Sequence, residues 1–276
     1  MRSSLEVFDI ASGRARVILQ TDRLIEAPNW DPRGGALLVN GDGRLFRVAL
    51  AAPALTPVDT DFADACNNDH GFSPDGRRIA LSHATAAGST IFTVPATGGS
   101  PVPVTDTNPS YWHGWSPDGG ELAYCGKRAG AFDIHTIAPS GGGERRLTRD
   151  MGHCDGPDYS PDGAWIWFNS DVSGHAQLWR MRRDGSAAQR MTQDRRVNWF
   201  PHPAPLGGRV VYLSYPPGTV GHPADRAVEL RVMPLEGGTG RRLLLFNGGQ
   251  GTLNVPCWSP DGRSFAFVRY AEGSRG

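Results

Sequence analysis

Phe72-Ser73-Pro74-Asp75-Gly76-Arg77-Arg78-Ile79-Ala80-Leu81-Ser82 is the stretch that decides the fold of this 276-residue chain. In its Ser-Pro-Asp-Gly core, proline presets φ for a turn, aspartate bonds its own backbone, and glycine adopts the positive φ that returns the chain. The apolar residues that follow predict a strand. Intact or degenerate copies of the core begin at Asp31, Ser73, Ser116, Ser160, Ala204 and Ser259.

The spacing of these copies indicates a repeat protein. Their prolines are 42, 43, 44, 44 and 55 residues apart, at Pro32, Pro74, Pro117, Pro161, Pro205 and Pro260. A period of about 40–45 residues is typical of a propeller blade with four strands. We therefore predict an all-β fold, a six-bladed β-propeller of four-stranded antiparallel blades, with residues 1–276 in a single domain.

The two ends of the chain are predicted to share the last blade. After Trp258 the final repeat supplies only one more strand, at 265–268, while residues 5–10 and 16–19 form two alternating segments before the first turn. We predict that residues 1–20 complete the last blade with 252–270, which closes the ring and removes open sheet edges. The 55-residue step contains an insertion within 215–228, which is either a functional loop or a tolerated surface excursion.

Composition narrows the partners and the compartment. The chain has 28 basic residues (Lys and Arg) and 28 acidic residues (Asp and Glu), so its formal net charge is zero. A neutral chain does not favour nucleic acid or an anionic membrane as a partner. No run of apolar residues approaches the length of a membrane-spanning segment. Residues 1–5 contain no apolar stretch, so we expect no secretory signal. The cysteines lack a C-x-x-C pattern and are predicted to be reduced thiols of a cytoplasmic protein: Cys66, Cys125, Cys154 and Cys257.

The Ser-Pro-Asp-Gly copies share two further features. An aromatic residue precedes five of them, and Gly-rich turns such as Gly98-Gly99 and Gly141-Gly142-Gly143 follow. With these features the sequence resembles the TolB-like (WD-repeat-like) β-propeller family along essentially the whole chain. The resemblance implies the fold and says little about activity. The sequence is also more distantly similar to intracellular oligogalacturonate lyases. This second likeness implies a divalent metal held by histidines near the central channel, and an activity of β-elimination on uronic acid sugars.

The residues just before each turn are unusually polar. These six windows of seven residues should form the innermost strands, and they hold four of the eight histidines and five of the nine asparagines. A buried polar side chain costs a few kcal/mol unless it is paired, so the concentration needs a reason. One interpretation is a water-filled channel whose polar residues cap strand carbonyls. The other is a ligand pocket at the channel mouth.

The pocket interpretation names its residues. His70 and His113 stand three residues before the turn in adjacent repeats, so we expect their imidazoles to lie close together. We predict that His70, His113 and His202 are catalytic. With Asp155 they form a predicted site for a divalent metal such as Mn, Ni or Zn. The predicted ligand-binding residues are Glu26, Asn68, Tyr111, His153, Asp155, Asn198 and Asn254.

The residue types suggest two kinds of function. A metal beside these groups would neutralise a uronate carboxylate and acidify its α-proton, as a uronate lyase requires. Without a metal, the same ring suits hydrogen bonding to the hydroxyls of a small polar or carbohydrate ligand. The alternative from a different class is a non-catalytic protein-interaction scaffold of the TolB type, with protein partners instead of a small ligand.

Overall fold

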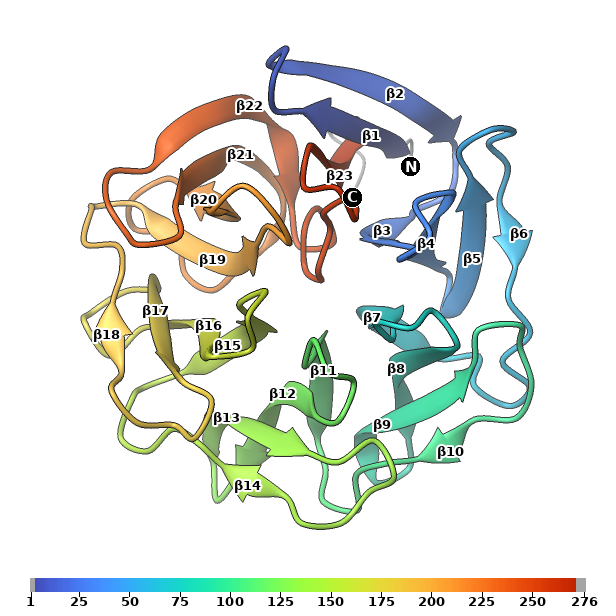
Figure 1. Cartoon of the computed structure of the whole chain (residues 1–276), viewed down its shortest axis with the longest axis horizontal. Coiled ribbons are helices and arrows are strands. Elements are labelled where there is room, and N and C mark those ends of the chain that lie inside the picture. The colour runs from blue at the N-terminus through green and yellow to red at the C-terminus, as the bar shows by residue number, and fades with distance from the viewer. Residues whose placement is uncertain (1–2, 272–276) are drawn as a thin grey trace.

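A computed structural model describes residues 3–271, which form twenty-three β-strands and no helix. The strands build six sheets that are arranged as blades around a central axis (Figure 1). Among residues 3–271 there is accordingly no helix long and apolar enough to cross a membrane. The predicted six-bladed all-β propeller is confirmed.

Five blades are four-stranded antiparallel sheets that run from the centre outwards in chain order. The first contains β3 (Glu26–Trp30), β4 (Ala36–Gly41), β5 (Arg44–Ala49) and β6 (Thr56–Pro57). The second contains β7 (Cys66–Phe72), β8 (Arg78–Thr85), β9 (Gly88–Pro95) and β10 (Val102–Pro103). The third contains β11 (Ser110–Trp115), β12 (Leu122–Arg128), β13 (Ala131–Ile137) and β14 (Arg145–Arg146). The fourth contains β15 (Cys154–Tyr159), β16 (Trp165–Ser170), β17 (Gln177–Arg182) and β18 (Gln189–Arg190). The fifth contains β19 (Val197–Pro203), β20 (Arg209–Tyr215), β21 (Ala224–Pro234) and β22 (Arg241–Gly249).

The sixth blade joins the two ends of the chain. Its strands are β23 (Ser264–Tyr270), β1 (Ser3–Asp9) and β2 (Arg14–Thr21), and β1 pairs with β23 so that Leu5 faces Val268. Figure 1 shows these first and last strands side by side. Residues 252–258 hold the innermost position through a Trp258–Phe265 bridge and a hydrogen bond from the Ala266 amide to the Cys257 carbonyl. The predicted closure is confirmed; residues 1 and 2 of the predicted segment lie outside the described residues.

The Ser-Pro-Asp-Gly turns have the geometry that their residues dictate. At the first intact copy, Ser73 Oγ donates to Asp75 Oδ1 at 2.6 Å, and Gly76 has a φ of +66°. The glycines of the other intact copies have φ between +65° and +69°. The expected positive φ is therefore confirmed at all four turns.

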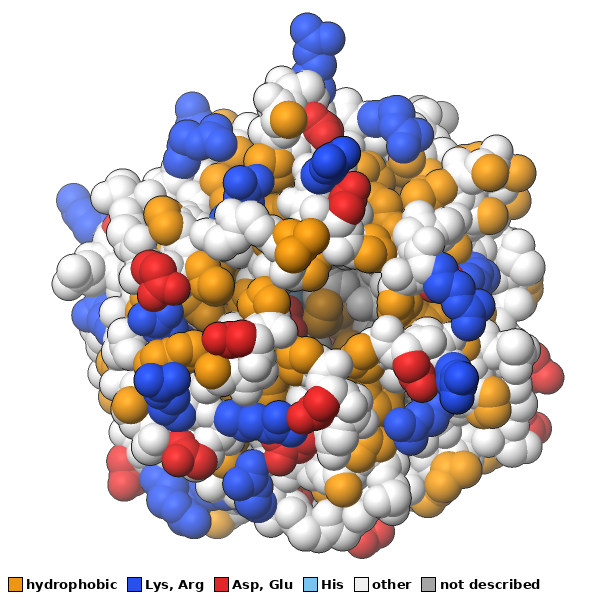
Figure 2. All heavy atoms as spheres, in the orientation of Figure 1, with side chains coloured by type: hydrophobic (Ala, Val, Ile, Leu, Met, Phe, Trp, Pro, Cys, Tyr) orange, Lys and Arg blue, Asp and Glu red, His pale blue; other side chains and the backbone are white. Residues whose placement is uncertain are grey.

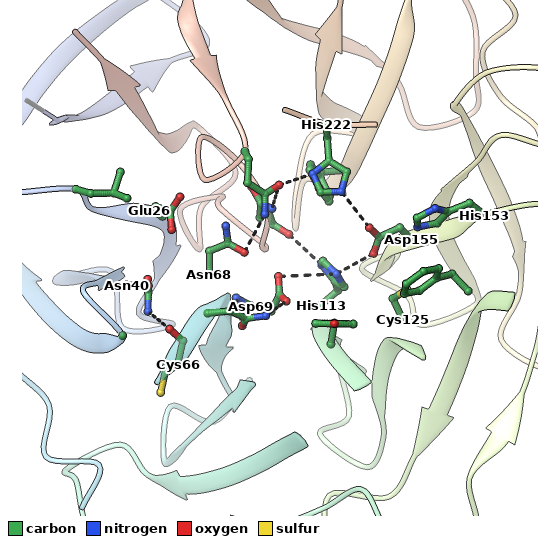
Figure 3. Close-up of a pocket in the computed structure, with 18 of the residues that line it drawn as sticks. Glu26, Asn40, Cys66, Asn68, Asp69, His113, Cys125, His153, Asp155 and His222 are labelled. Atoms are coloured by element: carbon green, nitrogen blue, oxygen red, sulfur yellow. Dashed lines mark hydrogen bonds and ion pairs between the residues drawn. The ribbon is translucent and has the colours of Figure 1, made fainter. Parts of the chain in front are cut away.

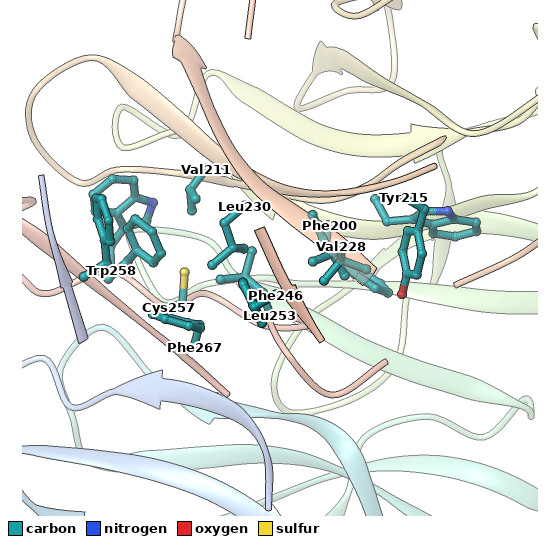
Figure 4. Packing of buried hydrophobic residues seen from close by; sticks show 14 of the residues in the cluster. Phe200, Val211, Tyr215, Val228, Leu230, Phe246, Leu253, Cys257, Trp258 and Phe267 are labelled. Atoms are coloured by element: carbon teal, nitrogen blue, oxygen red, sulfur yellow. The ribbon is translucent and has the colours of Figure 1, made fainter. Parts of the chain in front are cut away.

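Apolar side chains fill the space between neighbouring blades. The cluster in Figure 4 joins the fifth and sixth blades, with Leu230 and Phe246 packed beside Trp258 and Phe267. The aromatic residues before the turns also link neighbouring blades. Trp115 Nε1, for example, donates to the Gly71 carbonyl of the preceding blade at 3.2 Å. This packing holds the inner strands, and hence the channel walls, in fixed positions.

Candidate ligand pocket at the channel mouth

Bulges in the innermost strands decide which side chains reach the channel. Five of these strands carry a register shift, located at Glu26/Asn29, Cys66/His70, Trp112/Gly114, Asp155/Asp158 and Trp199/His202. A bulge leaves residues without a cross-strand partner and redirects their side chains. Some residues of the polar windows found in the sequence therefore turn toward the axis at one end of the ring.

Two of the bulges hold a non-glycine residue in the left-handed region. Ala27 has a φ of +52° and Phe200 a φ of +53°. Such a backbone costs on the order of 1–3 kcal/mol and tends to occur at functional sites. The Phe200 amide donates to Asn169 Oδ1 at 3.1 Å, and the ring lines the cavity described next.

The cavity has a volume of about 600 Å³ and lies at the end of the channel where the innermost strands begin (Figure 3). Its lining includes four carboxylates, those of Glu26, Asp42, Asp69 and Asp155. The imidazoles are those of His113, His153 and His222, and the amides those of Asn40, Asn67, Asn68, Gln250 and Asn254. Among the described residues that line it there is no Lys or Arg.

His113 occupies the bulge of β11 and is the centre of the polar network. Its Nε2 lies 3.1 Å from Asp155 Oδ1 and 3.9 Å from Asp69 Oδ1, and its Nδ1 lies 3.1 Å from the Asn254 carbonyl oxygen. Burial alone would lower the pKa of His113, but the charges of Asp69 and Asp155 raise it to about 9. The ring is therefore an imidazolium at neutral pH and donates from both nitrogens.

The two carboxylates beside His113 differ in their pKa. Burial raises the pKa of Asp69 to about 6, against the opposing effect of His113. Burial acts on Asp155 in the same direction, but the hydrogen bond and charge of His113 outweigh it and hold the pKa of Asp155 well below its usual value. Asp155 is thus the more readily ionised of the two carboxyl groups, and Asp69 takes up a proton more readily.

A chain of amides forms the opposite wall. His222 Nδ1 donates to Gln250 Oε1, which also accepts from Asn254 Nδ2 at 3.1 Å. Gln250 Nε2 donates to Asn68 Oδ1 at 3.3 Å. His222 belongs to the insertion between β20 and β21, so this insertion builds part of the cavity wall, and Gln250, which follows β22, connects it to Asn68 of β7.

Seven of the ten predicted site residues line the cavity. They are Glu26, Asn68, Tyr111, His113, His153, Asp155 and Asn254. The other three, His70, His202 and Asn198, are fully buried elsewhere. The structure therefore does not assemble the predicted metal set of His70, His113, Asp155 and His202.

His70 and His113 do not share the cavity, because their strands bulge at different places. His70 pairs with Leu81, and the extra residues of β7 come before it, between Cys66 and His70. His113 is itself the extra residue of β11, between Trp112 and Gly114. The same distance from the turn therefore directs one imidazole into a blade interface and the other into the channel.

His202 and Asn198 have structural partners instead. His202 Nδ1 lies 2.9 Å from Asp158 Oδ2, and its Nε2 lies 3.2 Å from the Leu253 carbonyl oxygen. Asn198 Oδ1 accepts from Ser214 Oγ at 2.7 Å. Both side chains satisfy buried polar groups inside the ring.

Sequence reasoning missed several residues of the cavity. Asp69 lies in one of the polar windows before the turns but is not among the predicted site residues. His222 and Gln250 lay outside the windows, although the unusual length of the repeat pointed to His222. Cys125 comes from β12, the second strand of its blade, and its Sγ, a nitrogen of His153 and an oxygen of Asp155 lie within 4.8 Å of one another. Burial raises the pKa of the Cys125 thiol well above its usual value.

The other end of the channel is apolar. A second cavity of about 450 Å³ is lined by the prolines of all six turns and by aromatics that include Trp30, Trp115 and Trp258. Figure 2 shows hydrophobic side chains around a central hollow on the face seen in Figure 1. The two mouths of one channel thus differ in chemistry.

The six blades, closed by the first and last strands, make this chain a β-propeller with a polar cavity at one mouth. The TolB beta propeller domain family matches residues 111–222. An uncharacterized protein of Agrobacterium fabrum is 51% identical over 272 residues, which are 98% of this chain and 93% of that protein. The chain belongs to the TolB-like β-propeller family, as its repeats predicted.

Solved structures agree with this assignment. A candidate TolB from Agrobacterium tumefaciens is 50% identical, with a TM-score of 0.96 over 98% of this chain and 99% of that one. TolB from Acinetobacter baumannii is 17% identical, with a TM-score of 0.70 over 90% of this chain and 64% of that one. The second likeness concerns the fold alone.

Proposed function

We propose that this protein binds a small, polar, carbohydrate-like ligand in the cavity at the polar mouth. The observation that carries the proposal is the convergence of five amides, four carboxylates and three imidazoles on one space of about 600 Å³. Pockets for small molecules measure roughly 300–1,000 Å³ and place a few polar groups for orientation. Tyr111, Phe132 and Phe200 add apolar faces to the same lining.

The charge of the lining favours a neutral ligand. No Lys or Arg belongs to the described lining, and the imidazolium of His113 already faces Asp69 and Asp155. A uronate would bring its own carboxylate close to these anions, and like charges repel strongly away from water. Sugar hydroxyls, in contrast, match amide and carboxylate acceptors. Uronate lyase activity would therefore need a bound metal to offset the charge of the substrate.

Calorimetry with neutral saccharides and with uronate oligosaccharides tests the proposal. We expect the neutral sugars to bind, and the uronates to bind at least about tenfold more weakly unless metal is added. Asn68→Ala should weaken binding about tenfold, as expected for one lost hydrogen bond of roughly 1.4 kcal/mol. Asn247→Ala removes an amide that bonds Asp225 outside the cavity and should change nothing. Absence of all saccharide binding contradicts the proposal, and an unsaturated uronate product would establish the lyase instead.

The apolar mouth supports a second candidate function, a protein-interaction scaffold. Its ring of prolines and tryptophans offers the kind of surface that protein partners bury. A photo-crosslinking residue placed at Pro74, on this mouth, should then give protein adducts in cells. The same residue placed at Tyr111, on the polar mouth, serves as the control. Adducts from neither position would remove the scaffold function.

We also propose a cytoplasmic location, because the four cysteines are buried and none forms a disulfide. Reduced thiols are usual in that compartment. Cell fractionation of the full-length protein tests this point, and recovery with the periplasmic fraction would contradict it.

A further inference from the structure

Three metal-binding side chains meet on one wall of the cavity (Figure 3). Cys125 comes from β12, Asp155 from β15, and His153 from the residue just before β15. One ligand atom of each lies within 4.8 Å of the other two. A tetrahedral zinc ion holds its ligand atoms about 3–4 Å apart, a separation close to the one found here.

His153 is oriented by packing and keeps its ring nitrogens available. Its imidazole stacks on Phe132 at 4.5 Å with 10° between the planes, and meets Trp199 edge-on at 6.0 Å. Its backbone amide donates to Asp171, but no described residue bonds the ring nitrogens. The two aromatic contacts fix the plane of the ring and leave both nitrogens free to bind a metal ion.

His222 presents a second nitrogen toward the same place. Gln250 Oε1 is an acceptor, so Nδ1 of His222 carries the hydrogen and Nε2 keeps its lone pair. That Nε2 faces Asp155 Oδ2 at 3.7 Å, too far for a hydrogen bond. The imidazole nitrogen and the carboxylate oxygen each offer an electron pair, and the 3.7 Å between them leaves a suitable place for a cation.

From these contacts we infer that Cys125, His153 and Asp155 form a zinc site in the cavity wall, with the fourth ligand position open toward His222 and the cavity. A thiolate with an imidazole selects zinc over Mg²⁺, Ca²⁺ and Mn²⁺, which prefer oxygen ligands. The thiol of Cys125 loses its proton to solvent when the Zn–S bond forms. The open position lets the ion bind a water or a polar group of a ligand. This inference does not rest on the proposed sugar ligand.

Cobalt(II) is the probe, because a thiolate bound to it gives a charge-transfer absorption that oxygen and nitrogen ligands do not. We expect the metal-free full-length protein to bind one equivalent of cobalt with this absorption, and zinc to displace it. Cys125→Ala and His153→Gln should each lower zinc affinity roughly 100-fold or more. The matched control is Cys257→Ala, which removes an equally buried thiol in the core between the fifth and sixth blades.

Thermal melting of each variant checks that it is folded, and the partly exposed His153 makes His153→Gln the safer of the two. Cobalt absorption that survives Cys125→Ala would overturn the inference. So would a wild-type protein that binds no zinc at micromolar concentration, or that binds manganese as tightly as zinc. These titrations contain no saccharide, so zinc binding without sugar binding supports the site while contradicting the proposed function.

Discussion

At the scale of single residues, His70 shows how burial controls a titrating group. The ring is fully buried, and neither nitrogen has a partner in hydrogen-bonding geometry. Burial lowers the pKa of His70 to about 4, although the nearby backbone of Ala27, Leu38 and Asn67 favours the charged ring. The folded protein therefore holds this histidine neutral.

Acid should weaken the fold through this one group. In the unfolded chain a histidine has a pKa of about 6.5, so the unfolded state binds the proton first as pH falls. The stabilisation is complete above pH 6.5 and is lost as pH falls toward 4, by on the order of 3 kcal/mol. Urea unfolding of the wild type and of His70→Leu should be measured at pH 7, 5.5 and 4. As the pH falls, the free energy of unfolding of the wild type should decrease relative to that of the variant. A constant difference between the two proteins would contradict the prediction.

Gly76 offers a prediction about the turns. A Cβ at this position would meet no atom closer than 3.8 Å, so any cost of Gly76→Ala comes from its φ of +66°. We expect a loss of about 1–2 kcal/mol in the free energy of unfolding. Gly35→Ala is the matched control, because Gly35 has open space and no positive φ. The control should be neutral or slightly stabilising, and equal losses at both glycines would refute the turn argument.

The residue scale is also where prediction from sequence stops. Repeat arithmetic placed Glu26, His113 and Asp155 on strands that border the channel, and the cavity contains all three. It could not reveal that β7 and β11 bulge at different positions, because a bulge depends on pairing with the next strand. One residue of register decides between a blade interface and the channel. That is why the cavity contains His113 and not His70.

At the scale of elements, the β1–β2 hairpin supplies the outer strands of the sixth blade. Removing residues 1–20 should expose the edge of β23 and leave Val7 and Phe8 missing from two hydrophobic clusters. We expect aggregation or a fall in melting temperature of many degrees. A synthetic peptide of residues 1–22 added in trans should restore part of the loss. A truncated protein that melts like the full chain would contradict the closure.

The strands could be predicted where a motif recurs at a regular spacing in the sequence. They were predicted less completely where the structure depends on pairing between distant segments. The turns and the closing hairpin follow from the sequence because their residues determine local geometry. The innermost segment of the sixth blade lies where the repeat predicts it, but it is not a regular strand: residues 252–258 contact β23 through one isolated bridge and the hydrogen bonds from the Ala266 and Val268 amides. The insertion is visible in the sequence as extra length, but the bond of its His222 to Gln250, and that of Gln250 to Asn68, are long-range contacts.

At the scale of the whole molecule, a chain without net charge separates two kinds of surface along one axis. Carboxylates and amides gather at one mouth, while prolines and aromatics gather at the other. The repeat explains the apolar mouth directly, because the same turn recurs six times. The polar mouth uses residues that differ from blade to blade, so the fold family does not determine its ligand.

The pairing of Leu5 with Val268 also sets the order in which this protein must be made. The ribosome releases β1 long before β23, because the other five blades lie between these two strands in the chain. At roughly 5–20 residues per second, the hairpin waits on the order of ten seconds or more for its partner. During that time its apolar residues remain available to chaperones and to neighbouring nascent chains. The earlier blades fold while the chain still grows, and the ring closes only after β23 has left the ribosome.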